Sequence, residues 1–568
     1  MKPLACGDPP QASLSPRVLP QSQLGERSLH VGFRRTAPQP DPDHQPGGTH
    51  VTRSSRAPRQ LLRAVLGLLI LVSGLSLLPA VAGAQSDAEV QRALDSWYKR
   101  AKRRAPGEWG IAIADQTGRV LWSVAEDQPL LPASTVKLFT TGFARSTLGG
   151  NARVATRVVG NGMVDPFTGQ WMGTWALELN GDLSLERASR QGPLLADLAR
   201  QLSARGIRQL QGPLVVRSAD GPADAVFPSV WASRHKGRLF APPVGALTLN
   251  ENTVEFTVRP GGKSGARPVI IGESPRGVSQ LVTNRARTVA GRRSTLRLSP
   301  TPSGGWILSG NIGTSARPRR LTRVANDPEA VLRVVWGTAL SDADIQWDHS
   351  FALSSSTTPE PSVVMAQIES PTLDSLASEV NTRSLNIGAE LLLRWAGGAT
   401  NAAQKLMAHI SSITGSTDGI HLVDGSGLST EDRIAPAVFI SYLTRFPMTP
   451  EGRNFPLLLP ANGEGTLGRL GGMPGQGVVR AKTGTLGNVS TLVGYLGRPE
   501  GVLVVTLMYN GGYSYTARQE EWRLFRTLGA DAVQIPADQS IAEEPPQLGG
   551  DDEAPLALPT PAIGFGIF

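Results

Sequence analysis

A serine and a lysine three residues apart, at the expected start of a helix, constrain this chain more than any other stretch. The stretch runs Leu-Pro-Ala-Ser-Thr-Val-Lys-Leu-Phe from Leu131 to Phe139. Pro132 suits the first turn of a helix, where a missing N–H costs little, and residues three apart share a helix face. Ser134 and Lys137 would then be neighbours. Because a lysine whose pKa is lowered by burial can remove a serine proton, the stretch predicts a serine nucleophile activated by lysine.

The Ser-x-x-Lys spacing alone is too common to establish a serine nucleophile, but two further motifs support this interpretation. Other copies of the spacing occur at Ser96–Lys99 and Ser233–Lys236. Ser384–Asn386 is a Ser-x-Asn triplet at an expected helix start, and Lys482–Gly484 is a Lys-Thr-Gly triplet at an expected strand end. Single matches arise by chance. Three matches in order, each at the right kind of element, favour one catalytic site around Ser134.

Composition narrows the classes of function. Of the formal net charge of +9, residues 1–84 account for +5, with nine Lys/Arg and four Asp/Glu. The remaining +4 is too small to argue for a nucleic-acid partner. The only cysteine is Cys6, and no histidines stand at ligand spacing, so we expect no disulfide, no metal site and no cofactor.

Residues 1–84 have the pattern of a disordered extension followed by a secretory signal peptide. Four arginines precede an apolar run over residues 64–78, and Ala82-Gly83-Ala84 follows it. The run has 15 residues, short of the roughly 20 that a membrane-spanning helix needs. We expect the mature chain to begin near Gln85, and an uncleaved N-terminal anchor is the alternative. Either outcome predicts an exported protein of the periplasm or cell envelope, attached to a membrane only through an uncleaved signal.

The segments around the first and last motifs predict a sheet covered by helices. Residues 109–114 and 120–124 are β-prone runs that flank a turn, which predicts a hairpin. Three more strands are expected between residues 478 and 509. Helical patterns over residues 88–105 and 516–528 would pack on this sheet. The predicted fold class is α+β, with an αβα domain.

The pattern changes between residues 155 and 350, where short strand candidates alternate with turns and with two helical pieces. This predicts an α+β insert that splits the αβα domain in sequence and that could hold one module nested in another. The catalytic segments would then be residues 85–154 and 351–534. Residues 535–568 are proline-rich and acidic, and we expect them to be disordered.

On these motifs the chain resembles the D-Ala-D-Ala carboxypeptidase/endopeptidase family of low-molecular-mass, class C penicillin-binding proteins, over about residues 88–530. The separation of 250 positions from Ser134 to Ser384 is typical of that family and far exceeds the gap in β-lactamases. The second motif has Leu385 where the family pattern has aspartate, and Asn180–Leu183 only partly matches the family's Gly-Gly-Asp-Pro turn. Further resembling stretches are Asn250–Gly261, Pro371–Arg394, Asp424–Ser429, Gly465–Leu467 and Ala481–Leu486.

The resemblance implies a serine β-lactamase/transpeptidase-like fold and assigns the chemical roles. Ser134 would attack a carbonyl and form an acyl-enzyme, with Lys137 as the general base. Lys482 would help to lower the pKa of Lys137. Ser384 would relay a proton to the leaving amine.

The resemblance also assigns the substrate contacts. Asn386 would hold the substrate amide and Lys137, while Lys482 and Thr483 would bind the terminal carboxylate. Gly484 would leave room for a substrate strand at the sheet edge. The backbone N–H groups of Ser134 and Thr485 would form the oxyanion hole.

The predicted function is hydrolysis of the terminal D-Ala-D-Ala bond of peptidoglycan stem peptides, which could extend to D,D cross-links. β-Lactam antibiotics, which mimic that bond, are expected to bind. Two alternatives remain open: a β-lactamase, and a catalytically silent envelope protein that binds peptidoglycan. Release of D-Ala from a synthetic pentapeptide would separate the three.

Overall fold

The computed structural model describes residues 87–187, 192–347, 351–353, 363–529 and 532–535. The predicted signal segment and nearly all of the predicted acidic tail lie outside these residues. Among the described residues, no helix has the length and apolar character to cross a bilayer.

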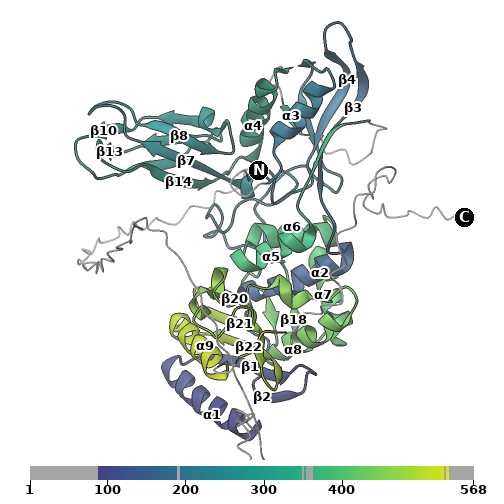
Figure 1. Ribbon diagram of the computed structural model, residues 1–568, viewed down its shortest axis with the longest axis vertical. Coiled ribbons are helices and arrows are strands. Elements are labelled where there is room, and N and C mark those ends of the chain that lie inside the picture. Colours follow the sequence, from purple (N-terminus) through teal and green to yellow (C-terminus); the bar gives the residue numbers. More distant parts are fainter. Residues whose placement is uncertain (1–86, 188–191, 348–350, 354–362, 530–531, 536–568) are drawn as a thin grey trace, which may run out of the picture. The chain divides into compact units, whose positions relative to one another are not determined.

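Both ends of the described chain contribute to one five-stranded antiparallel sheet (Figure 1), with strand order β2-β1-β22-β21-β20. β1 pairs with β22 along its whole length, from Glu108 opposite Asn510 to Asp115 opposite Leu503. The expected hairpin and the three late strands are therefore parts of a single sheet. The strands are β1 (Glu108–Asp115), β2 (Val120–Val124), β20 (Val479–Leu486), β21 (Val489–Arg498) and β22 (Gly501–Asn510).

Helices cover both faces of this sheet, which confirms the predicted αβα arrangement. Because successive side chains of a strand point to opposite faces, Ile111 and Ile113 of β1 join one apolar core and Ala112 and Ala114 join another. The first core includes α1 (Asp87–Arg104) and α9 (Ser514–Leu528). The second includes α2 (Lys137–Leu148), α5 (Leu373–Arg383), α6 (Asn386–Gly397), α7 (Ala402–Thr414) and α8 (Pro436–Arg445), and a small ladder of β18 (Ile420–His421) and β19 (Arg433–Ile434) lies near it.

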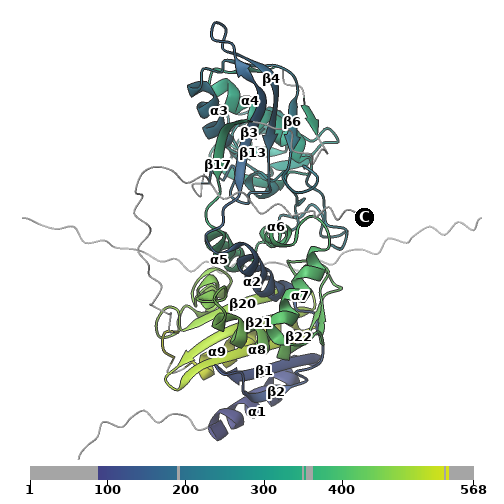
Figure 2. The ribbon, with the colours of Figure 1, turned by 90° about the vertical axis from the view of Figure 1, so that its right-hand side faces the viewer.

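A second sheet occupies the chain between α2 and α5 (Figure 2). β3 pairs with β17 from Ala155 opposite Glu369 to Gly160 opposite Val363. The sheet of the insert therefore extends past residue 350, where we expected it to end, and the chain leaves it near residue 370. Its strands are β3 (Ala155–Val164), β4 (Gln170–Glu178), β5 (Gln209–Leu210), β6 (Leu214–Arg217), β15 (Gln346–Trp347), β16 (Phe351–Leu353) and β17 (Val363–Glu369), and its helices are α3 (Leu195–Ala204) and α4 (Pro328–Asp342).

The chain between β6 and α4 contains a group of short strands, here called the nested module (residues 253–324). A three-stranded sheet has the order β14-β7-β8, and a second three-stranded sheet and a two-stranded sheet accompany it. Its apolar side chains join the core of the insert through Val254, Phe256 and Val258. The strands are β7 (Thr253–Arg259), β8 (Val269–Ser274), β9 (Val282–Asn284), β10 (Arg287–Val289), β11 (Arg297–Pro300), β12 (Trp306–Ser309), β13 (Asn311–Gly313) and β14 (Arg319–Val324).

Candidate active site

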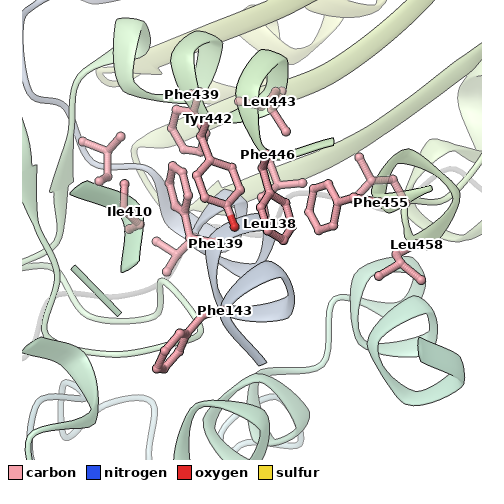
Figure 3. Packing of buried hydrophobic residues seen from close by; sticks show 14 of the residues in the cluster. Leu138, Phe139, Phe143, Ile410, Phe439, Tyr442, Leu443, Phe446, Phe455 and Leu458 are labelled. Atoms are coloured by element: carbon pink, nitrogen blue, oxygen red, sulfur yellow. The ribbon is translucent and has the colours of Figure 1, made fainter. Parts of the chain in front are cut away.

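α2 is a core helix, and its burial decides the character of the site. Every residue from Lys137 to Ala144 is buried. Phe139 stacks on Phe439 of α8 at a ring-centroid distance of 4.7 Å and meets Tyr442 edge-on at 4.9 Å (Figure 3). Aromatic pairs of this geometry stabilise a core beyond the area they bury. The helix that begins with Lys137 therefore holds this amine away from bulk water.

Ser134 lies in a tight turn just before α2, at residues 133–136, which form a 3-10 helix. The preceding Ala133 has a φ of +48°, a left-handed conformation that is uncommon outside glycine and that clusters at functional sites. The predicted helix start is therefore a strained turn, which presents the serine ahead of the regular helix.

Two glycines from distant segments pack against this turn. A Cβ at Gly484 of β20 would overlap the hydroxyl of Thr491 and lie 2.7 Å from the Pro132 carbonyl oxygen. A Cβ at Gly427 would overlap the carbonyl oxygen of Ala133. Gly484 thus lets the protein's own backbone approach β20, which differs from the expected role of leaving room for a substrate strand.

Lys137 contacts the hydroxyl of Ser134 and two oxygens that can only accept. Its Nζ lies 3.0 Å from Ser134 Oγ, 2.6 Å from Asn386 Oδ1 and 2.6 Å from the carbonyl oxygen of Ser426. A neutral amine has two hydrogens and one lone pair. The two hydrogens satisfy Asn386 and Ser426, which leaves the lone pair for the hydroxyl proton of Ser134.

Burial lowers the pKa of Lys137 from 10.5 to about 7, while the negative charges of Asp424, Glu390 and Asp432 oppose this shift. The amine is therefore partly neutral near pH 7, as a general base requires. We expected Lys482 to lower this pKa, but burial is the dominant cause. Repulsion between the two amines instead affects Lys482. Burial is the main cause, and the charge of Lys137 the next, that holds the pKa of Lys482 well below its usual value.

Three buried carboxyl groups lie behind Lys137, on α6 and the turn of residues 424–432. Asp424 accepts backbone N–H groups of Ser426, Gly427 and Ser429 at 3.1, 2.6 and 2.8 Å and so shapes the turn that presents the Ser426 carbonyl. Burial, followed by the charge of Asp424, raises the pKa of Glu390 and of Asp432. Among the described residues, no group of three or more such side chains is arranged to hold a metal ion.

Ser384 and Lys482 form the second contact pair. Lys482 Nζ donates to Ser384 Oγ at 2.8 Å and to the Thr483 carbonyl oxygen at 2.8 Å. Ser384 lies at the junction of α5 and α6 with a φ of +58°, a strained conformation for a serine. The hydroxyl is thus fixed by an unusual backbone on one side and by the buried amine of Lys482 on the other.

Asn386 bridges the site and the insert. Its Oδ1 accepts from Lys137, and its Nδ2 donates to the carbonyl oxygen of Phe240 at 2.8 Å. Since a side-chain amide nitrogen has two hydrogens, one hydrogen remains for a substrate carbonyl.

β20 is an edge strand whose free side faces the site. The Ala481 N–H donates to the Pro460 carbonyl oxygen at 3.3 Å, and Val479 accepts from Asn462 at 3.0 Å, so both turn their backbone groups away from β21. Backbone groups alternate in direction along an antiparallel strand. Thr483 and Thr485 therefore direct theirs to the same free edge, where a substrate strand could pair. The hydroxyl of Thr485 lies 3.3 Å from Arg518 of α9.

A cavity of about 630 Å³ begins at Ser384 and Asn386 and extends toward the insert. Its wall includes Phe240 and Arg383 together with polar side chains of the nested module. A volume in this range is typical of sites that bind whole small molecules.

The structure thus brings Ser134, Lys137 and Asn386 into one contact group, Ser384 and Lys482 into another, and Gly484 against the Ser134 turn. The other Ser-x-x-Lys copies lie elsewhere, in α1 and in a turn near residue 235. The sequence patterns single out the stretches that contain Glu390, Asp424 and Ser426 without assigning these residues a role, and they do not single out Asp432. Their side-chain types carry no signal of a contact with Lys137, because that contact runs through a backbone carbonyl.

The fold and this geometry define an enzyme equipped for acyl transfer to a serine beside a lysine. A family profile described as the D-Ala-D-Ala carboxypeptidase 3 (S13) family matches residues 90–525. The chain belongs to this family and is a serine-type D-Ala-D-Ala carboxypeptidase, as the motifs predicted.

Relatives agree with this assignment, and a solved structure has the same fold. The D-alanyl-D-alanine carboxypeptidase of Actinomadura sp. (strain R39) is 26% identical over 425 residues, covering 71% of this chain and 77% of that protein. Carboxypeptidase DacB of Mycolicibacterium smegmatis is 26% identical over 447 residues, covering 74% and 80%. The crystal structure of penicillin binding protein 4 from Haemophilus influenzae has the same fold, with a TM-score of 0.61 and 21% identity over 76% of this chain and 98% of that chain.

Proposed function

We propose that the enzyme removes the terminal D-Ala of peptidoglycan stem peptides through an acyl-enzyme on Ser134. The observation that carries this mechanism is the set of three neighbours of Lys137, which leaves its lone pair for the Ser134 proton. Ser134 Oγ attacks the carbonyl of the penultimate D-Ala and its proton passes to Lys137. The C–N bond then breaks, and D-Ala leaves with a proton on its amine, which gives the acyl-enzyme. Water attacks the acyl-enzyme, and its proton returns to the Ser134 oxygen as the shortened peptide leaves.

The remaining roles follow from position. The backbone N–H groups of Ser134 and Thr485 stabilise the oxyanion, a contribution of about 3 kcal/mol for each donor. Ser384, whose hydroxyl is held by Lys482, hands a proton to the leaving amine. Lys482 and Thr483 bind the free carboxylate at the edge of β20.

The cavity beyond Ser384 supports a second activity, cleavage of D,D cross-links. Removal of a single D-Ala needs no volume of about 630 Å³. The space could accommodate the second peptide of a cross-link.

Binding of β-lactams belongs to the same proposal, because these compounds present a strained amide and a carboxylate in the geometry of D-Ala-D-Ala. A related crystal structure of penicillin binding protein 4 from Haemophilus influenzae is described as a complex with a β-lactam. We also propose export to the periplasm or cell envelope through the segment near residues 64–84, with a mature start near Gln85.

The division of the chain into domains is a further part of the proposal. One domain would combine residues 85–154 with residues from about 370 to 534, and the insert would occupy the chain between them. The apolar cores support this division, because the buried residues of the insert core run from Val158 to Ala366, although Leu183 of the insert packs into the core of the other domain.

Release of D-Ala from a synthetic pentapeptide tests the function, with Ser134→Ala as the inactive control. Turnover by the wild type, and its loss in the variant, would support the proposal. Rapid hydrolysis of penicillin without D-Ala release would instead indicate a β-lactamase. Peptidoglycan binding with neither reaction would indicate a silent binding protein.

A further inference from the structure

The nested module carries a charge that the composition of the whole chain conceals. Residues 253–324 contain thirteen Lys/Arg and only two Asp/Glu, Glu255 and Glu273, a net charge of +11. Residues 85–568 together carry only +4. The rest of that segment is therefore net negative, and the positive charge is concentrated in about 70 residues. Twelve of the thirteen basic residues are arginines, the side chain best suited to carboxylate and phosphate groups.

Eight of these basic residues gather at one end of the nested module and are here called the basic cluster. Backbone hydrogen bonds bring their loops together. Gly265 N–H donates to the Thr288 carbonyl oxygen at 2.8 Å, and Gly313 N–H donates to the Arg293 carbonyl oxygen at 2.7 Å. All eight side chains belong to exposed residues: Arg259, Lys263, Arg267, Arg287, Arg292, Arg293, Arg317 and Arg319. Within the described part of the chain, none of the eight forms an ion pair with a carboxylate.

One face of the sheet β14-β7-β8 connects this cluster to the cavity that begins at Ser384 and Asn386. Along β7, buried and outward residues alternate, so Glu255, Thr257 and Arg259 share the outward face. Glu255 lines the cavity that begins at Ser384 and Asn386. Arg259, at the cluster end, is four residues further along the strand. A strand rises about 3.3 Å per residue, so roughly 13 Å of strand separates the cavity wall from the cluster.

The neighbouring strands continue the same face. Arg320 of β14 pairs opposite Thr257, and Val269 of β8 pairs opposite Arg259. Arg320 also lines the cavity and forms an ion pair with Glu255 at 2.5 Å. Along β7 and β14 the face therefore runs from the cavity wall to exposed arginines, while the pairing of β8 with β7 has an irregularity between Thr257 and Val258.

We propose that the basic cluster is an exosite for polymeric peptidoglycan, bound through the carboxylates of neighbouring stem peptides while one peptide end occupies the active site. The exosite rests on the proposed function, which makes D-Ala-terminated peptides the substrate. Each uncleaved D-Ala-D-Ala end carries a carboxylate, so a polymer that displays many of them is a polyanion. Holding the polymer near the site raises the effective concentration of its peptide ends. Continuity with the cavity favours the substrate polymer over other anions.

The test compares the full chain with two variants of equal charge change. Arg259→Gln, Arg267→Gln and Arg292→Gln together neutralise part of the basic cluster. Lys99→Gln, Lys102→Gln and Arg103→Gln together remove three exposed charges of α1 and serve as the matched control. Binding is measured by co-sedimentation with insoluble peptidoglycan that has been stripped of attached phosphate polymers. kcat/KM for a soluble pentapeptide is measured in parallel.

The cluster variant should bind the polymer about tenfold more weakly at low salt, with kcat/KM for the pentapeptide within about twofold of wild type. The difference should shrink as salt screens the charges. Wild type should bind peptidoglycan with amidated carboxylates as weakly as the cluster variant binds the untreated polymer. The α1 variant should bind as wild type does.

Three results would overturn the exosite: equal polymer binding by the cluster variant and wild type, equal loss in the α1 variant, or unchanged binding to amidated peptidoglycan. Binding to vesicles that contain phosphatidylglycerol is measured as a fourth comparison. The exposed apolar side chains of Val269 and Ile271 beside the arginines would also suit a lipid surface. Tighter binding to vesicles than to stripped peptidoglycan would make the cluster a lipid site. A wild-type chain that binds the polymer through the cluster but releases no D-Ala would refute the proposed function alone.

Discussion

Glu251 of the insert holds Arg383, the residue directly before Ser384, through two hydrogen bonds. Arg383 Nη1 donates to Glu251 Oε1 at 2.5 Å, and Nη2 donates to Oε2 at 2.9 Å. Glu251 lies in a turn in which three successive residues, 250–252, have positive φ values. Arg187 of the insert completes the network with ion pairs to Glu251 at 3.3 Å and to Glu379 of α5. The insert therefore fixes the backbone that carries Ser384.

Glu251→Gln should loosen Ser384, because Glu251 acts on the backbone of Ser384 through Arg383. We expect kcat for the pentapeptide to fall about tenfold with KM changed by less than about threefold, because the proton relay and not the carboxylate contact is displaced. The free energy of unfolding should fall by about 1–3 kcal/mol, since an ion pair in a partly buried network is broken. Glu255→Gln is the matched control, because Glu255 pairs with Arg320, whose side chain is 69% exposed. Equal effects of both variants would argue against a positioning role.

Ser134→Ala should abolish both D-Ala release and covalent labelling by penicillin, because no other group near Lys137 can accept the acyl chain. Mass spectrometry of a penicillin-treated digest should place the adduct on the peptide that contains Ser134. Ser96→Ala and Ser233→Ala should be labelled as wild type is. An adduct on either of those serines, or labelling that persists in Ser134→Ala, would contradict the assignment.

kcat/KM should rise with pH through an apparent pKa near 7. Burial lowers the pKa of Lys137 to about 7, and only the neutral amine can take the Ser134 proton. Activity is therefore lost as the pH falls and Lys137 gains its proton. The same shift makes the unfolded chain bind the proton more tightly than the folded chain, so this group's contribution to stability increases from about pH 7 to pH 10.5. A pH–rate profile measures the effect. The rise of kcat/KM near pH 7 should persist in Lys482→Ala if it reports the titration of Lys137.

Lys482→Ala should raise KM for a pentapeptide with a free carboxylate more than for its C-terminal amide. Loss of a hydrogen bond to a charged group weakens binding by about 1.5–3 kcal/mol, or roughly 10- to 100-fold. kcat should fall as well, because Lys482 also holds Ser384 Oγ at 2.8 Å. Steady-state kinetics on both peptides decide the matter, and equal KM changes would count against the carboxylate contact.

Gly484→Ala should destabilise the protein by about 1–3 kcal/mol and slow acylation by penicillin. The added methyl group would overlap the hydroxyl of Thr491 and push on the Pro132 carbonyl oxygen, which lies two residues before Ser134. Gly487→Ala, two positions after Thr485, is the matched control, because a Cβ there meets nothing within 4 Å. Thermal unfolding and the rate of acylation measure the two effects. A Gly484→Ala variant with normal acylation would show that β20 does not restrain the turn.

Short-range patterns in the sequence were sufficient to predict the motif residues and the αβα fold. The contact between Ser134 and Lys137 depends on residues three apart, and the alternation in β1 and the hairpin with β2 are likewise short-range patterns. The return of β16 and β17 to the insert sheet past residue 350 depends on pairing with β3 and β6, more than a hundred residues earlier. No local periodicity could reveal that register.

The sequence by itself determined which residues we propose as nucleophile, base and carboxylate-binding cation, because these are side-chain types at recognisable spacings. Only the tertiary structure decided the state of those groups. Burial lowers the pKa of Lys137, Glu251 restrains Ser384 from the insert through Arg383, and the nested module gathers arginines that the net charge conceals. Desolvation and electrostatic contacts depend on which distant segments fold together in space, and short-range patterns do not contain that information.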